Sequence, residues 1–154
     1  PFLIRGGTAR GKGRGEQWEY FRGTDPHWLL IVKPEVSVST AAAYGQFKGT
    51  SAITSQTIDS VEKFLKASQF AEAFNASGNT CEELIFPLYP ELEVCKRFFT
   101  ERGYDTLMTG SGPTMVVRLD KAMDALQLQE EIKQAGHNWL SLITKTCTEE
   151  DCHA

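Results

Sequence analysis

The sequence of 154 residues lacks the features that would mark a membrane or disulfide-rich protein. Its longest apolar run, Trp28 to Val32, is far shorter than the roughly 20 residues of a membrane-spanning helix. No charged-then-apolar leader opens the chain. Of the four cysteines, Cys81 and Cys95 fall on expected helices, Cys147 and Cys152 on a polar tail, and none forms a CxxC pair. We therefore expect reduced thiols in an intracellular protein with no membrane contact.

A metal centre also finds little support in the sequence. Cys147, Cys152 and His153 have a C-x4-C-H spacing that a zinc site could use, but a second pair of ligands is lacking. We therefore expect no metal site. The chain begins at Pro1 without a methionine and enters directly on the apolar run Pro1 to Ile4. Such a start is expected of a fragment or a processed product, because an apolar run makes a poor frayed terminus.

Basic residues are slightly outnumbered overall, 16 Lys and Arg against 20 Asp and Glu, but several are concentrated near the start. The net charge of −4 argues against a general nucleic-acid-binding protein, although Arg5, Arg10, Lys12 and Arg14 lie close together among glycines. Interleaved Arg and Gly also occur in disordered RNA-binding segments. This stretch is short, flanked by apolar residues and without aromatic residues at its centre. It predicts two strands with a glycine-loosened bend, and no nucleic-acid partner.

The remaining chain predicts one hydrophobic core, since 41% of its residues are hydrophobic. Residues 28–32 should form a buried strand, and apolar residues recur at helical spacing from Ile58 to Leu65 and after Pro90. Short helices are expected at residues 41–44 and 79–86. Asp120 is expected to cap a helix with Ala125, Leu128, Ile132 and Ala135 on one face, followed by a strand over 139–145 and a loosely held tail from Thr146.

The order strand, helices, strand, strand, helix, strand predicts an α+β fold of the ferredoxin-like split βαβ type. An antiparallel sheet with helices on one face would bury the apolar sides of both. The opening hairpin has no place in this unit. We therefore predict that residues 1–25 end a neighbouring N-terminal domain, that residues 26–146 form the ferredoxin-like domain, and that residues 147–154 are a polar tail.

The stretch from Leu107 to Val117 is the strongest local signal. Two short β-prone runs flank Thr109-Gly110-Ser111-Gly112-Pro113-Thr114, and the glycines permit backbone angles barred to other residues. Successive N–H groups of such a turn can point into one concavity and hold an anion. Taken alone, the turn favours an ordinary hairpin, because short glycine-rich turns are common and specify no chemistry.

Four stretches in chain order carry distinctive motifs. They are Pro1 to Ile4 with GGTA and GKGRGE, VSTAAAY at residues 38–44, NTCE at 79–82 with YPEL at 89–92, and TGSGPT at 109–114. In the same order they resemble the PFF…GGTALGTGRGE, VSTAWAY, NDLE…YPEL and SGSGPT segments of the 4-diphosphocytidyl-2-C-methyl-D-erythritol kinases of the GHMP kinase superfamily. The match covers the C-terminal half of these kinases. Arg10, Lys12 and Thr80 depart from the pattern, Thr80 by replacing an acidic residue.

The resemblance implies transfer of the ATP γ-phosphoryl to the 2-hydroxyl of the cytidyl-methylerythritol substrate, with ATP and Mg²⁺ as cofactors. It places Thr40 and Tyr44 at the substrate, with Tyr44 against the cytosine. Gly110, Ser111 and Gly112 would lie near the phosphates, with Gly112 against the phosphate-binding turn of the other domain. The family's catalytic aspartate falls just before the position of Pro1, and its lysine and ATP loop lie further upstream.

The implied partners are a small-molecule substrate and a missing N-terminal kinase half, and a homodimer or larger assembly is compatible with the sequence. The implied location is a bacterial cytoplasm, or the plastid stroma of a photosynthetic eukaryote. An alternative of another class is a catalytically silent kinase-like structural or interaction subunit. Homoserine and mevalonate kinases fit less well, because they do not pair the GRGE and VSTA segments.

Overall fold

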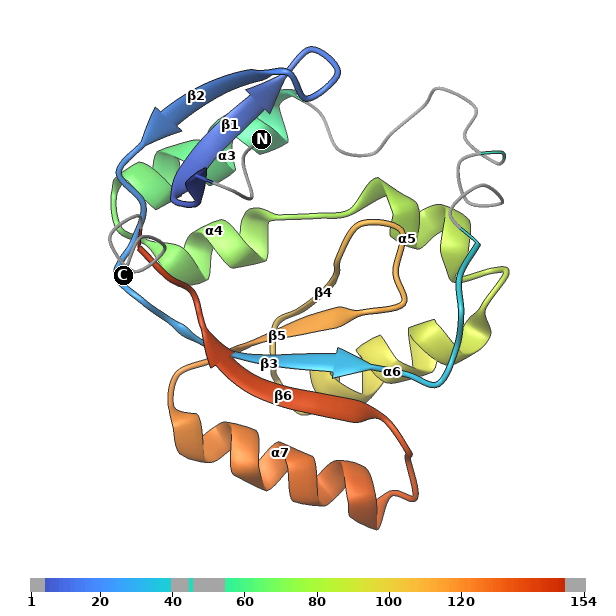
Figure 1. The fold of residues 1–154 in the computed structure, drawn as a ribbon. Coiled ribbons are helices and arrows are strands. Elements are labelled where there is room, and N and C mark those ends of the chain that lie inside the picture. The colour runs from blue at the N-terminus through green and yellow to red at the C-terminus, as the bar shows by residue number, and fades with distance from the viewer. Residues whose placement is uncertain (1–4, 40–44, 46–54, 149–154) are drawn as a thin grey trace.

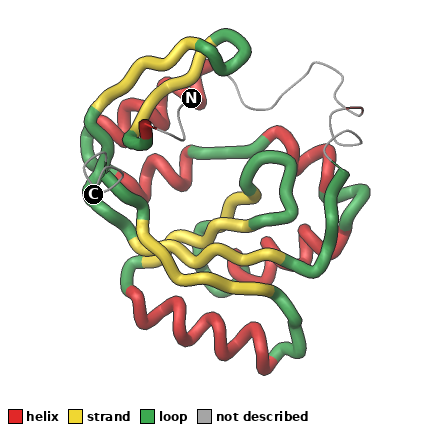
Figure 2. Tube along the Cα trace, viewed as in Figure 1, coloured by secondary structure: helices red, strands yellow, loops and turns green. Residues whose placement is uncertain are grey.

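The computed structural model describes residues 5–39, 45 and 55–148. A hairpin of β1 (Thr8–Lys12) and β2 (Gln17–Phe21) comes first, followed by β3 (Trp28–Lys33). The helices α3 (Ser55–Lys66), α4 (Phe70–Ala76), α5 (Thr80–Ile85) and α6 (Pro90–Thr100) lead to β4 (Thr106–Met108) and β5 (Met115–Leu119). The chain ends with α7 (Ala122–Gln134) and β6 (Leu140–Lys145). The hairpin lies apart from the other four strands (Figures 1 and 2).

The four later strands form one sheet in the order β4-β5-β3-β6, and all neighbours are antiparallel. This order, with a helix before the second strand and another before the fourth, is the ferredoxin-like split βαβ arrangement that the sequence predicts. The α+β fold class is therefore confirmed. β3 is an inner strand that pairs with both β5 and β6. The long connection from β3 to β4 and the shorter one from β5 to β6 therefore join strands of the same sheet.

One face of the sheet carries the core. Leu30 and Val32 of β3 lie opposite Val117 and Met115 of β5, and these four side chains are fully buried. They pack on one face of α6 and one face of α7, whose buried residues are Leu92, Cys95, Phe98 and Phe99 on α6 and Ala125, Leu128 and Ile132 on α7. The helical spacing thus correctly places Ala125, Leu128 and Ile132 inside, and the apolar run at 28–32 forms a strand whose Leu30 and Val32 are buried.

The structure differs from the sequence-based expectations at the ends of the last elements. Lys121, and not Asp120, precedes the first turn of α7, and its N–H donates to the Asp124 carboxylate at 3.1 Å. Asp120 instead accepts a hydrogen bond from Arg118. Ala135 ends α7 and is exposed. Thr146 is held to the start of β3, contrary to the expected loose tail. Its N–H donates to the His27 carbonyl and its hydroxyl oxygen accepts from the His27 N–H, each at 2.9 Å.

Helix α4 has no counterpart among the expected elements, and its only buried residue is Ala73. The short helix expected at residues 41–44 lies outside the described residues.

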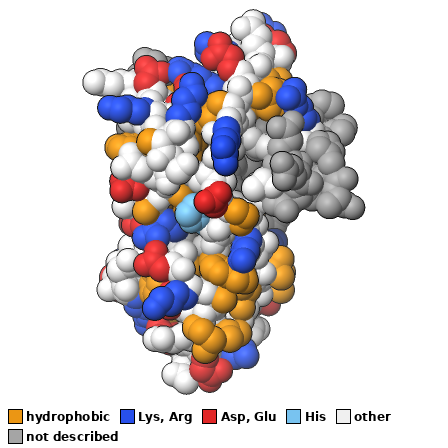
Figure 3. Space-filling view, turned by 90° about the vertical axis from the view of Figure 1, so that its left-hand side faces the viewer, with side chains coloured by type: hydrophobic (Ala, Val, Ile, Leu, Met, Phe, Trp, Pro, Cys, Tyr) orange, Lys and Arg blue, Asp and Glu red, His pale blue; other side chains and the backbone are white. Residues whose placement is uncertain are grey.

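Among the described helices, none is long and apolar enough to cross a membrane. Exposed apolar side chains occur on α7, at Met123 and Leu126, and on β6, at Leu140 and Leu142, and Figure 3 shows hydrophobic side chains gathered in the lower half, where these elements lie.

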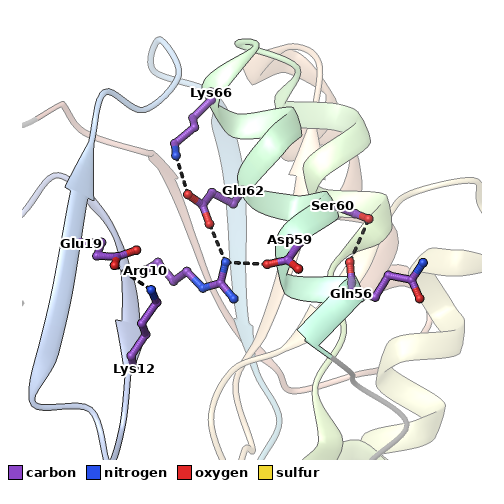
Figure 4. A network of polar contacts seen from close by, with 8 residues as sticks. All are labelled: Arg10, Lys12, Glu19, Gln56, Asp59, Ser60, Glu62 and Lys66. Carbon is purple, nitrogen blue, oxygen red and sulfur yellow. Dashed lines mark hydrogen bonds and ion pairs between the residues drawn. The ribbon is translucent and has the colours of Figure 1, made fainter.

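The β1–β2 hairpin packs on α3 through charged side chains. The Arg10 guanidinium on β1 lies 2.8 Å from the Glu62 carboxylate and also pairs with Asp59, and Lys66 pairs with Glu62 (Figure 4). The Lys66 ammonium also lies 5.1 Å from the centre of the Phe21 ring on β2. Hydrogen bonds from Lys66 and then Arg10 lower the pKa of Glu62. The expected strands and bend are confirmed, and the assignment of residues 1–25 to another domain stays a prediction.

These contacts predict that Arg10 keeps the hairpin against α3. Replacing Arg10 with Met should speed amide hydrogen exchange in β1 and β2 by roughly two- to fivefold, the range expected for exposed ion pairs. Lys12→Met is the comparison variant, because Lys12 pairs with Glu19 inside the hairpin and not with α3. Exchange rates in Arg10→Met equal to those of the wild type would contradict the prediction.

The same contact should be sensitive to acid and salt. The pKa of Glu62 is lowered below its usual 4.5. The free energy that the ion pairs of Glu62 contribute is therefore fully present above pH 4.5 and is lost as the pH falls through the lowered pKa. On acidification, the amides of β1 and β2 should lose less protection from hydrogen exchange in Arg10→Met than in the wild type. High salt should weaken the wild-type contact in the same direction.

Candidate functional site

The glycine loop, residues 109–114, joins β4 to β5 as a tight turn. The Thr109 N–H donates to the Thr114 carbonyl at 2.8 Å, and the Gly112 N–H donates to the Thr109 carbonyl at 2.9 Å. Gly110 and Gly112 have φ values of 52° and 78°, and the Gly112–Pro113 peptide bond is cis. The amides of Thr109 and Gly112 are thus used inside the turn, so an anion bound at this loop would be held by other groups.

The two glycines of the loop face different surroundings. A Cβ at Gly112 would lie 2.7 Å from Sδ of Met108, a buried core residue, and 3.6 Å from Cδ1 of Leu92. A Cβ at Gly110 would meet nothing within 4 Å. A side chain at Gly112 would therefore point into this domain's own core, and not toward another domain as the sequence-based reasoning expected. Gly110 is the position that leaves the outer surface of the loop open.

Two side chains at the start of α5, Asn79 and Glu82, hold the start of the loop. Asn79 precedes α5, and its amide Nδ2 donates to the carbonyls of Met108 and Gly110, each at 2.7 Å, while its Oδ1 accepts from the Cys81 N–H. The Glu82 carboxylate accepts from the Met108 N–H at 2.8 Å. Sequence reasoning assigned neither residue a role. The signal was present in the resemblance of residues 79–82 to NDLE.

A lysine on α6 completes this polar cluster. The second oxygen of the Glu82 carboxylate pairs with the Lys96 ammonium at 2.5 Å, and the Glu82 side chain is only 14% exposed. The carboxylate thus has a backbone donor on one oxygen and a cation on the other. Glu82 and Lys96 therefore connect α5, α6 and β4 at the base of the glycine loop.

The C-terminal end of β3 and the glycine loop lie at the same end of the sheet. β3 runs from Trp28 to Lys33, and near its end Val32 lies opposite Met115, the first residue of β5 after the loop. The chain that follows β3 therefore leaves the sheet beside the loop, and Val38 packs against the core. Thr40 and Tyr44, the predicted substrate residues, lie outside the described residues.

Neither of two cavities coincides with the glycine loop. One, of about 1120 Å³, lies between the hairpin end and the start of the tail and is lined by Tyr20, Arg22 and Cys147 among others. The other, of about 350 Å³, lies between α4, α6 and β4 and is lined by Asn75, Lys96 and other residues. Within residues 5–39, 45 and 55–148, no group of three His, Cys, Asp or Glu side chains is placed to hold a metal ion. Cys152 and His153 of the candidate zinc cluster are not among these residues.

Comparison with known proteins gives consistent results. The profile of the family described as GHMP kinases C terminal matches residues 52–138. The chain is 36% identical over 116 residues to a 4-diphosphocytidyl-2-C-methyl-D-erythritol kinase of Exiguobacterium sibiricum, covering 75% of this chain and 40% of the relative. It is 35% identical over 115 residues to the enzyme of the same name from Bacillus cytotoxicus. The chain thus spans about two fifths of these relatives.

Solved structures share the fold at lower sequence identity. A crystal structure of 4-(cytidine 5'-diphospho)-2C-methyl-D-erythritol kinase superimposes with a TM-score of 0.64 at 18% identity, covering 90% of this chain and 50% of that one. A homoserine kinase from Cytophaga hutchinsonii gives a TM-score of 0.71 at 15% identity, covering 96% and 50%. These likenesses support the architecture alone, since kinases named for different substrates share it.

The geometry of the loop predicts unequal effects of two alanine substitutions. Both Gly110→Ala and Gly112→Ala place a side chain at positive φ, which costs on the order of 1 kcal/mol. Gly112→Ala also forces Met108 to move, and overpacking typically costs a further 1–3 kcal/mol. Urea unfolding should therefore show the larger loss of stability for Gly112→Ala. An equal or larger loss for Gly110→Ala would show that position 112 does not face the core.

Proposed function

The chain belongs to the GHMP kinase C-terminal family, and from this premise we propose that it is the C-terminal part of an ATP-dependent kinase. The proposed reaction is transfer of the γ-phosphoryl group to the 2-hydroxyl of 4-diphosphocytidyl-2-C-methyl-D-erythritol, a step of non-mevalonate isoprenoid biosynthesis. The observation that carries the proposal is the 36% identity to an enzyme of that name. The family profile supports a kinase, and the identity supports this substrate.

In this proposal the chain supplies positioning and the missing N-terminal half supplies the reacting groups. Phosphoryl transfer depends mainly on orientation and on neutralising charge, so a rigid loop beside the phosphates is useful without chemistry of its own. The loop of residues 109–114 is fixed by its internal hydrogen bonds and by Asn79. Its exposed Gly110 lets another backbone approach closely. Thr40 and Tyr44 would contact the substrate.

The cofactors are ATP and Mg²⁺, which neutralises phosphate charge when bound. The described residues contain no cluster suited to a metal ion. In this proposal Mg²⁺ would be held by the phosphates of the nucleotide and by residues of the N-terminal half. This division agrees with a chain that spans 40% of its relative.

A silent kinase-like subunit is the competing hypothesis, and the departures from the family pattern at Arg10, Lys12 and Thr80 are compatible with it. The structure supplies a use for two of these side chains. Arg10 pairs with α3, and Lys12 pairs with Glu19 on the neighbouring strand. In this proposal the two departures serve the packing of the hairpin.

The proposal is tested with the full-length protein and with residues 1–154 alone. The full-length protein should phosphorylate 4-diphosphocytidyl-2-C-methyl-D-erythritol with ATP. Residues 1–154 alone should show no turnover, and adding the separately produced N-terminal half should restore it. An inactive full-length protein, whose sequence before Pro1 lacks an aspartate and a glycine-rich loop, would favour the silent subunit instead.

Tyr44 gives a residue-level prediction for substrate binding. Stacking of a base on an aromatic ring contributes about 1–3 kcal/mol. In the full-length enzyme Tyr44→Ala should therefore raise the KM for the cytidyl substrate roughly five- to a hundredfold. Tyr44→Phe keeps the ring and is the matched control, with kinetics close to the wild type. A lower melting temperature with an unchanged KM in Tyr44→Ala would assign Tyr44 to the core.

A further inference from the structure

The strand before the glycine loop lies at an edge of the sheet. β4 has three residues and pairs with β5 on one side only. Met108 lies opposite Met115, and both its N–H and its carbonyl are bound by the side chains of Glu82 and Asn79. These two side chains therefore take the place that a neighbouring strand would occupy. An edge strand this short is otherwise weakly fixed.

Asn79 reaches one step further, into the loop itself. Its Nδ2 also donates to the Gly110 carbonyl at 2.7 Å, so one amide group binds the backbone at two points separated by Thr109. Only an amide side chain can serve these carbonyls and still accept from the Cys81 N–H, because it carries both donors and an acceptor. The residue type, and not merely its polarity, is required by this geometry.

We propose that Asn79 and Glu82 are positioning residues that set the conformation of the glycine loop, Asn79 through the Met108 and Gly110 carbonyls and Glu82 through the Met108 N–H. The effect on catalysis rests on the proposed kinase function, whereas the effect on the loop does not. Lys96 orients the Glu82 carboxylate from α6. The position of the loop is thereby coupled to the docking of α5 on β4.

Substitutions at Asn79 separate the loop contact from the helix cap. Asn79→Ser keeps a neutral oxygen that can accept from the Cys81 N–H, since serine is as good an N-cap as asparagine, but its short side chain does not reach both carbonyls. Asn79→Asp also keeps the cap, but an ionised carboxylate only accepts hydrogen bonds and would face two carbonyl oxygens. Both variants should fold, and both should release the loop.

Substitutions at Glu82 provide a conservative rescue. Glu82→Gln keeps an oxygen that accepts from the Met108 N–H and loses the charge pair with Lys96, whereas Glu82→Ala loses both contacts. Lys96→Met removes the charge pair alone. If the backbone contact is what matters, Glu82→Gln and Lys96→Met should resemble the wild type and Glu82→Ala should not.

The first readout is hydrogen exchange in the full-length protein without nucleotide. Exchange of the Thr109 and Gly112 amides should be roughly tenfold faster in Asn79→Ser, because about two hydrogen bonds are lost. The Met108 amide should be released in Glu82→Ala and stay protected in Glu82→Gln. Exchange in β3 and α7 should be unchanged in all of them. Unchanged protection of the loop amides in both Asn79 variants would overturn the proposal.

The second readout is kinetic and uses the same full-length variants. With the global melting temperature held within a few degrees, Asn79→Ser should lower kcat/KM for ATP roughly tenfold or more, and Glu82→Gln should leave it near the wild-type value. A released loop with unchanged kinetics would overturn the catalytic part of the proposal. If the wild-type full-length protein has no kinase activity, the proposed function fails, while the hydrogen-exchange result still decides whether these residues position the loop.

Discussion

The burial of one face of the four-stranded sheet is the constraint on which the rest of the structure depends. Leu30 and Val32 on the central strand meet Val117 and Met115 on one side and the apolar faces of α6 and α7 above them. This packing fixes the register of β5, and through Met108 opposite Met115 it also fixes β4. A register shift of one residue would turn these side chains to the opposite face. The glycine loop between β4 and β5 is therefore located by the core and not by its own sequence.

The core does not by itself hold the loop in one conformation, because β4 is short and lies at the sheet edge. Asn79 and Glu82 supply the missing edge contacts, and Lys96 ties them to α6. A kinase that works by orientation benefits from such a fixed loop, since small misplacements near the reacting phosphate reduce the rate strongly. The polar groups at the start of α5 thus connect the packing of the domain to its proposed function.

The hairpin follows a different principle from the sheet. Its contact with α3 is carried by Arg10, Glu62 and Lys66 at the surface, where ion pairs contribute little free energy and are screened by salt. The sequence placed Arg10 in a cationic cluster with no stated partner. The structure shows that its partners lie on a helix far along the chain, which the composition of residues 5–14 could not reveal.

Much of the fold was determined by the sequence alone, because local periodicity reports which side of an element is buried. The strand at 28–32, the buried faces of α6 and α7, the strand pair around the glycine loop and the ferredoxin-like order all follow from such patterns. The short helix α4 was not predicted, because its single buried residue, Ala73, leaves no periodic signal. Asp120 was wrongly predicted to cap α7, because its carboxylate accepts from Arg118 instead. Only the tertiary structure decided that Gly112 faces Met108, that Asn79 binds carbonyls as far as 31 residues away, and that Arg10 reaches Glu62 across 52 residues. Such contacts are set by how whole elements pack, and no local pattern in the chain records them.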